Sequence, residues 1–268
     1  MKQPILSLCL VLCLFCAHAQ TEKHKLFYGA YLQWGYNVES YTHSNIHFKM
    51  SNGDDFTLHH ARAHDRGDFD GIYKEPGEVS IPQYNYRIGL YLNKQFTKSI
   101  EINFDHAKYI VTDGQTVHVT GTIAGQHVDG DSILNPQRFL HYEHTDGANW
   151  LHINYAEQRA LLKTKSKARD LLRVIYKAGA GINIPRTDFT YHGDRLNNNF
   201  HIAGYNVSVE SGLRLYMLNG FFLEATGKTG YVRYIDALAN TTTAKGNKAT
   251  QGFGYIEGIV TLGYEFRF

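Results

Sequence analysis

The chain has 268 residues, enough for one all-β domain, and its 27 Lys and Arg nearly balance its 25 Asp and Glu. This even charge excludes the basic surface that nucleic acid requires, so no nucleic-acid partner is expected. Aromatic residues are abundant, with 19 Tyr and 15 Phe, although the mean hydropathy is negative. A negative average does not exclude a membrane β-barrel, because only alternate residues of a membrane strand need to be apolar.

The first 19 residues are predicted to be a cleaved signal peptide, which makes residues 20–268 the mature domain. An apolar run from Ile5 to Cys16 precedes Ala17-His18-Ala19, an A-x-A-type cleavage site. That run is too short to cross a bilayer as a helix, and no later segment offers the roughly 18 apolar residues that a spanning helix needs. The mature chain is also expected to lack disulfides and thiol chemistry, because all three cysteines lie in this run: Cys9, Cys13 and Cys16.

Eight segments of the mature chain alternate apolar and polar residues, which predicts strands because successive side chains of a strand point to opposite faces. In chain order they are residues 26–37, 83–93, 99–110, 150–162, 171–184, 201–217, 220–234 and 252–268. Long and short connections alternate between them. The long ones include the polar stretch 38–81, where Asn52-Gly53 favours a short hairpin, and residues 111–149. This rhythm is typical of an up-and-down barrel with short periplasmic turns, long outer loops and both termini on the periplasmic side.

The last segment, Gly252 to Phe268, alternates most clearly and finishes on an aromatic residue. This pattern resembles the closing strand of Gram-negative outer-membrane β-barrels, and the chain resembles the eight-stranded members of that class, the OmpA- and OmpX-like barrels. The resemblance implies an all-β fold: an eight-stranded antiparallel up-and-down transmembrane β-barrel with long extracellular loops, in the cell outer membrane. The implied partners are outer-membrane lipid and lipopolysaccharide, together with the barrel-assembly machinery, which would engage the C-terminal strand.

A soluble eight-stranded barrel such as a lipocalin is the structural alternative, but it would expose polar residues outside and have shorter loops. Aromatic residues near the strand ends favour the membrane barrel, which carries aromatic girdles at both interfaces. These residues are Tyr28, Trp34, Tyr36, Tyr84, Trp150, Tyr231, Phe266 and Phe268.

The inward faces of the predicted strands carry equal numbers of positive and negative side chains. The positive ones are Arg87, Arg173, Lys177, Arg214, Lys228 and Arg267, and the negative ones are Glu101, Asp105, Glu210, Glu224, Glu257 and Glu265. An eight-stranded barrel is just wide enough for side chains to fill it, and buried charges persist only when they are paired. We therefore expect a salt-bridged, plugged interior and not a diffusive pore.

Histidine is unusually frequent, and most of the 15 fall in the predicted outer loops or near the outer rim. Imidazole and carboxylate groups suit Zn²⁺ or another divalent metal, which makes the loop residues candidate ligands. These candidates are His59, His60, His64, Asp65, His141 and His144. No spacing among them is a recognised ligand motif, and the alternative interpretation is polar loop residues that face solvent and lipopolysaccharide.

Asp105 and His152 are predicted to face inward on adjacent strands near the outer end, where a carboxylate could orient an imidazole as a general base. Some eight-stranded outer-membrane barrels are lipid A deacylases or palmitoyltransferases, so these two residues are the catalytic candidates. The deacylase pattern, a His and a Ser separated by one residue on a strand, is not matched by His43-Ser44. The alternative is a satisfied interior pair.

The sequence thus predicts a non-enzymatic surface barrel with a plugged polar interior and a His-rich extracellular cap, in a structural, adhesive or ligand-binding role. The alternative is a lipid A-modifying acyl hydrolase or acyltransferase. The sequence does not name the extracellular ligand.

Overall fold

The computed structural model describes residues 25–67, 83–164, 170–217 and 220–268. The predicted signal peptide, residues 1–19, lies outside this part of the chain. Within it, no helix is both long and apolar enough to cross a membrane.

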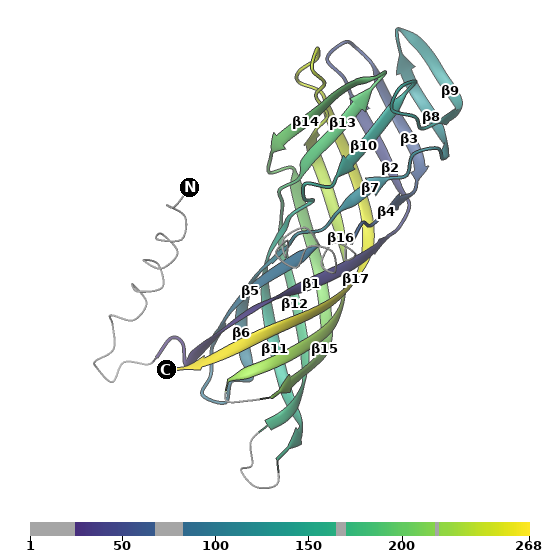
Figure 1. The fold of residues 1–268 in the computed structure, drawn as a ribbon. Coiled ribbons are helices and arrows are strands. Elements are labelled where there is room, and N and C mark those ends of the chain that lie inside the picture. The colour runs from purple at the N-terminus through teal and green to yellow at the C-terminus, as the bar shows by residue number, and fades with distance from the viewer. Residues whose placement is uncertain (1–24, 68–82, 165–169, 218–219) are drawn as a thin grey trace, which may run out of the picture.

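Eight long strands form a closed antiparallel barrel (Figure 1). In chain order they are β1 (Gly29–Tyr41), β5 (Tyr84–Tyr91), β6 (Lys98–Asp105), β11 (Trp150–Lys163), β12 (Asp170–Asn183), β15 (Gly204–Tyr216), β16 (Phe221–Leu238) and β17 (Lys248–Arg267). Each pairs with its neighbour in sequence, and β1 pairs with β17 as well as with β5, which closes the sheet. The predicted eight-stranded up-and-down barrel is confirmed.

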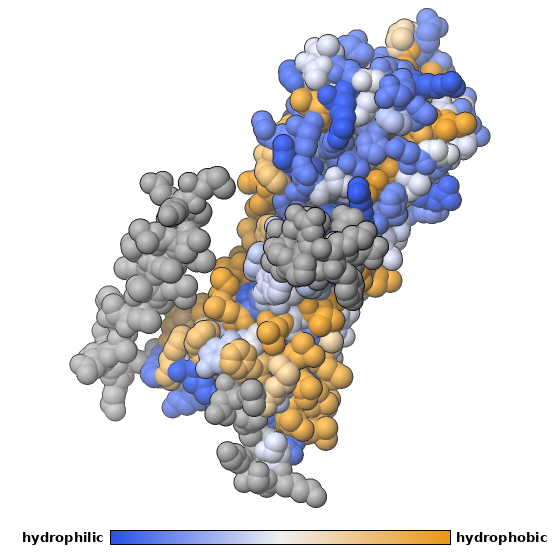
Figure 2. Space-filling model, viewed as in Figure 1, coloured by the Kyte–Doolittle hydropathy of each residue, from blue (hydrophilic) through white to orange (hydrophobic). Residues whose placement is uncertain are grey.

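The outer surface of the barrel is apolar. Side chains that point away from the lumen are exposed and large, among them Ile88, Ile102, Ile153, Val209, Leu213 and Leu262. Tyrosines at positions 86, 155, 176, 205 and 231 are also exposed on this surface. Figure 2 shows the apolar surface over the barrel and a polar surface over the opposite end of the molecule. Such a belt on a closed barrel faces lipid, and this architecture fits the predicted outer-membrane location.

Trp150 is an exception to the predicted girdle. Its side chain is fully buried inside the barrel, where its ring packs against Tyr255 with centroids 4.5 Å apart. The position shares the inward parity of His152, two residues later, so the strand period itself places it inside.

The lumen holds the predicted charged side chains. Eleven of the twelve are buried, and the exception is Arg267 at the end near the termini, whose side chain is 65% exposed. Arg87 contacts Glu210 at 2.6 Å, Lys177 contacts Glu224 at 2.8 Å and Glu101 at 3.0 Å, and Arg214 contacts Glu224 at 2.7 Å. These buried pairs fill the lumen, as predicted, and oppose its use as a diffusive pore.

The long outer connections are not irregular loops, because they fold into a second β unit that we call the head. Four strands extend the barrel sheet through β17: β2 (Ser44–Lys49), β3 (Asp55–Ala61), β8 (Thr116–Ile123) and β9 (Gln126–Ile133). A separate sheet has the order β14-β13-β10-β7-β4. Its strands are β4 (Ala63–His64), β7 (Tyr109–Val111), β10 (Leu140–His144), β13 (Arg186–Tyr191) and β14 (Asp194–Phe200). The head lies at the end of the barrel away from the C-terminus (Figure 1), and Gly29 at the start of β1 pairs with Arg267 beside that terminus.

The two sheets of the head pack face to face around an aromatic core. Phe48 of β2 stacks on Phe189 of β13 at 5.5 Å between centroids, and Phe56 of β3 stacks on Tyr191 at 5.9 Å. All four side chains are buried. The Asn52-Gly53 hairpin is confirmed, since it joins β2 to β3 with Gly53 at φ 97°, a value that favours glycine. The sequence predicted only that hairpin within the polar stretches 38–81 and 111–149 and left the structure of the long loops open, and the described part of both stretches forms the strands of the head.

Candidate functional site

The predicted catalytic pair does lie inside the barrel on neighbouring strands, but its surroundings do not suit a general base. Asp105 Oδ2 and His152 Nε2 are 3.6 Å apart, and both side chains are fully buried. Lys228 contacts both residues. Its Nζ forms an ion pair with Asp105 and lies 3.3 Å from His152 Nε2. The ammonium donates to that imidazole nitrogen, so the lone pair of the imidazole is engaged.

The predicted metal ligands are dispersed over the head. His59 Nε2 bonds Thr120 Oγ1 at 2.7 Å, His64 Nδ1 bonds Thr112 Oγ1 at 2.9 Å, and His60 is exposed with φ 54°. Asp65 accepts the backbone N–H of Glu39 at 2.9 Å. The structure does not bring these side chains together.

His144 lies in the aromatic core of the head, not on its surface. Its ring is fully buried and packs on Tyr142 at 4.9 Å and on Tyr234 at 5.1 Å. Burial lowers the pKa of His144 to about 3, so the ring is neutral. In the described part of the chain, no group of three or more His, Cys, Asp or Glu side chains is placed to hold a metal ion.

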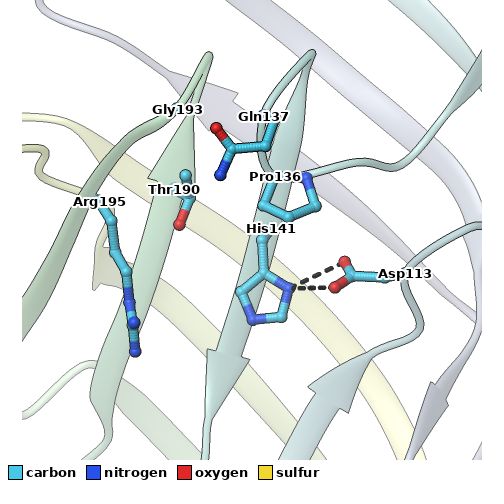
Figure 3. Close-up of a pocket in the computed structure, with 7 residues that line it drawn as sticks. All are labelled: Asp113, Pro136, Gln137, His141, Thr190, Gly193 and Arg195. Atoms are coloured by element: carbon cyan, nitrogen blue, oxygen red, sulfur yellow. Dashed lines mark hydrogen bonds and ion pairs between the residues drawn. The ribbon is translucent and has the colours of Figure 1, made fainter.

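His141, by contrast, lines a surface pocket of the head, shown in Figure 3. The pocket has a volume of about 310 Å³. Its walls come from three stretches of chain that are distant in sequence: Asp113, the segment Pro136–His141, and Thr190–Arg195. His141, Thr190 and Arg195 form a row across β10, β13 and β14, because the strand register places them opposite one another.

The charges around the pocket are held by ion pairs. His141 Nδ1 lies 2.8 Å from Asp113 Oδ1, and His141 Nε2 lies 3.2 Å from Glu143 Oε2. Burial disfavours the imidazolium, but hydrogen bonds to Glu143 and Asp113 outweigh it and raise the pKa of His141 to about 9. Arg195 holds Asp188 through two nitrogens, with Nη2 2.5 Å and Nε 3.0 Å from its oxygens. His141 is therefore a fixed cation at neutral pH.

Sequence reasoning found His141 but missed its partners. Asp113 lies 28 positions away and Arg195 lies in a connection between two barrel strands, so no local spacing joins them. A usable signal was present in Leu140–His144, where buried Leu140, Tyr142 and His144 alternate with His141 and Glu143. That alternation predicts a strand with His141 and Glu143 on one face.

Comparisons with known proteins give no relative by sequence: no protein-family model matches the chain, and no curated protein is similar to it. Solved structures do match the chain in outline, and three examples follow. The Neisserial surface protein A is 10% identical over 89% of this chain and 97% of its own, with a TM-score of 0.36. The attachment invasion locus protein of Yersinia pestis is 8% identical over 90% and 99%, with a TM-score of 0.35. The outer membrane protein OprG from Pseudomonas aeruginosa is 10% identical over 90% and 98%, with a TM-score of 0.40.

The architecture of this chain is assigned from its own strand pairing and surface. Eight antiparallel strands close on themselves, with an apolar exterior, a charged lumen and both described ends at one side. The chain is an eight-stranded β-barrel of the outer-membrane type, and it carries a folded head.

Proposed function

We propose that this protein is a ligand-binding protein of the cell surface, whose head holds a polar, hydroxyl-rich ligand in the pocket beside His141. The observation that carries the proposal is the head itself: a two-sheet unit with its own aromatic core, raised on a barrel whose lumen is filled by ion pairs. A barrel whose lumen is packed with paired charges favours function at its outer end.

The chemistry of the pocket favours a carbohydrate with an acidic group. Asp113 is 45% exposed and offers carboxylate oxygens to hydroxyl groups. Arg195, 69% exposed, has a guanidinium that can bind a carboxylate or hydroxyl in addition to Asp188. Gln137 and Thr190 add neutral donors and acceptors, and Pro136 supplies an apolar wall. The volume suits one or two sugar rings, at the lower end of about 300–1,000 Å³ for ligand sites.

Calorimetric titration of the detergent-solubilised protein with neutral, amino and uronic-acid oligosaccharides tests this proposal. We expect saturable binding of the acidic class, weakened at least tenfold by Arg195→Ala or Asp113→Asn. Arg186→Ala is the matched control, because Arg186 lies on the same sheet but pairs with Asp146 outside the pocket. Absence of binding to every sugar, or equal losses in Arg195→Ala and Arg186→Ala, would contradict the proposal.

The predicted partners of the barrel remain predictions. Outer-membrane lipid and lipopolysaccharide would contact its apolar belt, and the assembly machinery would engage β17. No observation in the site favours the lipid A-modifying alternative, since its candidate residues lie in the closed lumen.

A further inference from the structure

We propose that the junction between barrel and head is a calcium site built from Asn37, Glu39, Asp65 and Gln83. Asn37 and Glu39 lie on the outer half of β1, beyond its last pair with β5 at Tyr36. Asp65 follows β4 of the head, and Gln83 precedes β5. The four residues therefore come from three separate stretches of chain that meet where the wall of the barrel passes into the head.

The first observation is that three oxygens converge on one atom. The Nε2 of Gln83 lies 3.2 Å from the backbone oxygen of Asn37, 3.2 Å from Asp65 Oδ2, and in hydrogen-bond contact with Glu39 Oε2. An amide nitrogen has two hydrogens, so it cannot satisfy three acceptors at once. If the amide is turned so that its oxygen takes the place of Nε2, the two 3.2 Å distances become separations between oxygens. Oxygen ligands about 2.4 Å from a common Ca²⁺ lie roughly 3 Å from one another, which is close to that spacing.

The second, independent observation is that buried amide oxygens at the same place have no partner. Gln83 is 0% exposed and Asn37 is 1% exposed, and both amide groups point their nitrogens at Glu39. Among the described residues, Gln83 Oε1 and Asn37 Oδ1 have no hydrogen-bond donor. Rotation of either amide about its last bond exchanges oxygen and nitrogen, which turns a crowded donor into a cation ligand.

The balance of charge points the same way. Lower in the lumen, Arg87, Lys177 and Arg214 face three carboxylates. Near the junction, Lys228 is shared by Asp105 and Glu257, and Glu257 is directly opposite Glu39 in the β1–β17 register. Among the described residues neither Glu39 nor Asp65 has a Lys, Arg or His at ion-pair distance. Lys228 thus pairs with only two of these four carboxylates. Buried carboxylates require compensating charge.

The ligand set selects the kind of cation. Every proposed ligand is oxygen, from two carboxylates, two side-chain amides and one backbone carbonyl, which suits hard cations and not Zn²⁺ or Cu²⁺. Ca²⁺ accepts irregular sets of six to eight oxygens, whereas Mg²⁺ requires near-octahedral geometry and keeps more water. Bound Ca²⁺ would join Asp65 of the head to β1 of the barrel, and so fix the head on the barrel.

Calorimetric titration of Ca²⁺ into EDTA-treated, detergent-solubilised protein tests the proposal. We expect one saturable site, a higher thermal midpoint with Ca²⁺ than with equal Mg²⁺, and at least tenfold weaker Ca²⁺ binding in Glu39→Gln and Asp65→Asn. The matched controls, Glu157→Gln and Asp129→Asn, alter a half-buried and an exposed carboxylate elsewhere and should bind as the wild type does. Absence of saturable binding to the wild type, or equal loss in the controls, would overturn the proposal.

A second measurement needs no variant. Tb³⁺ substitutes for Ca²⁺ and luminesces when it is excited through nearby tyrosines, and Tyr41 lies two residues beyond Glu39. We expect luminescence that Ca²⁺ displaces at a stoichiometry of one. Tb³⁺ luminescence that Ca²⁺ does not displace would show adventitious surface binding and would overturn the assignment. A proton shared between the carboxyl groups of Glu39 and Asp65 would then be the explanation of their proximity.

Discussion

The protonated state of His141 gives a prediction that can be worked from the structure. Its ordinary pKa of about 6.5 is raised to about 9 by its partners, and that difference is equivalent to roughly 3 kcal/mol of preference for the charged form in the folded state. Asp113 is half exposed, so solvent screening reduces the stabilisation to about 1–2 kcal/mol. Because the folded pKa is the higher one, this stability is fully present below about pH 6.5 and is lost as the pH rises through about 9.

NMR titration of the His141 ring in the detergent-solubilised protein measures this pKa directly. Asp113→Asn removes one of its two carboxylate partners and should lower the pKa by more than one unit, while His59, which bonds a threonine hydroxyl, serves as an internal control. The protection factors of the β10 amides, which correct for the intrinsic rise of exchange with pH, should fall between pH 7 and pH 10 in the wild type and change less in Asp113→Asn. A His141 pKa at or below 6.5 would refute the argument, because the ion pairs would then not outweigh burial.

Three further outcomes are expected. Phe48→Ala leaves a cavity between the sheets of the head and should cost about 3–5 kcal/mol there, so limited proteolysis should cut the head faster while the barrel stays intact. Lys177→Met removes a buried cation from three carboxylates and should lower the free energy of unfolding by about 3–5 kcal/mol, whereas Lys248→Met on the exposed surface should be neutral in the same urea titration. His152→Ala should leave the lipid A mass spectrum of the cells unchanged, because the residue is buried in the lumen, and an acyl chain gained or lost with it would reopen the enzymatic alternative.

The barrel was predictable because the alternation that defines each of its strands lies within one short segment of the sequence. A period of two over a dozen residues fixes both the strand and the face of each side chain, and this placed Arg87 and Glu210 inside before any pairing was known. Strand ends were less certain: the first strand was predicted to end at Asn37, yet β1 continues to Tyr41. Because of that difference, Glu39 was not among the predicted inward residues, and the excess of negative charge at the junction was not predicted.

The head was not predicted, for two physical reasons. Its strands are short, and their outward positions carry His, Asp and Thr, so residues 44–61 appear polar on average although Ile46, Phe48, Phe56 and Leu58 alternate regularly. Its pairings are also distant in sequence, since β10 pairs with both β7 and β13 across different connections. The alternation could have predicted strands, but not which sheet each joins.

The same reasons explain where the functional candidates lie. Residues that neighbouring barrel strands bring together, such as Asp105 of β6 and His152 of β11, can be predicted from the sequence, and here they form part of the packed lumen. Residues that only the head brings together, such as Asp113, His141 and Arg195, line the exposed pocket. The barrel needs its inward charges paired to fold, whereas the head can vary its outward face without loss of its core. Specificity in this protein should therefore depend on the outward residues of β10, β13 and β14, and exchange of those residues between related heads should exchange ligands while the barrel stays the same.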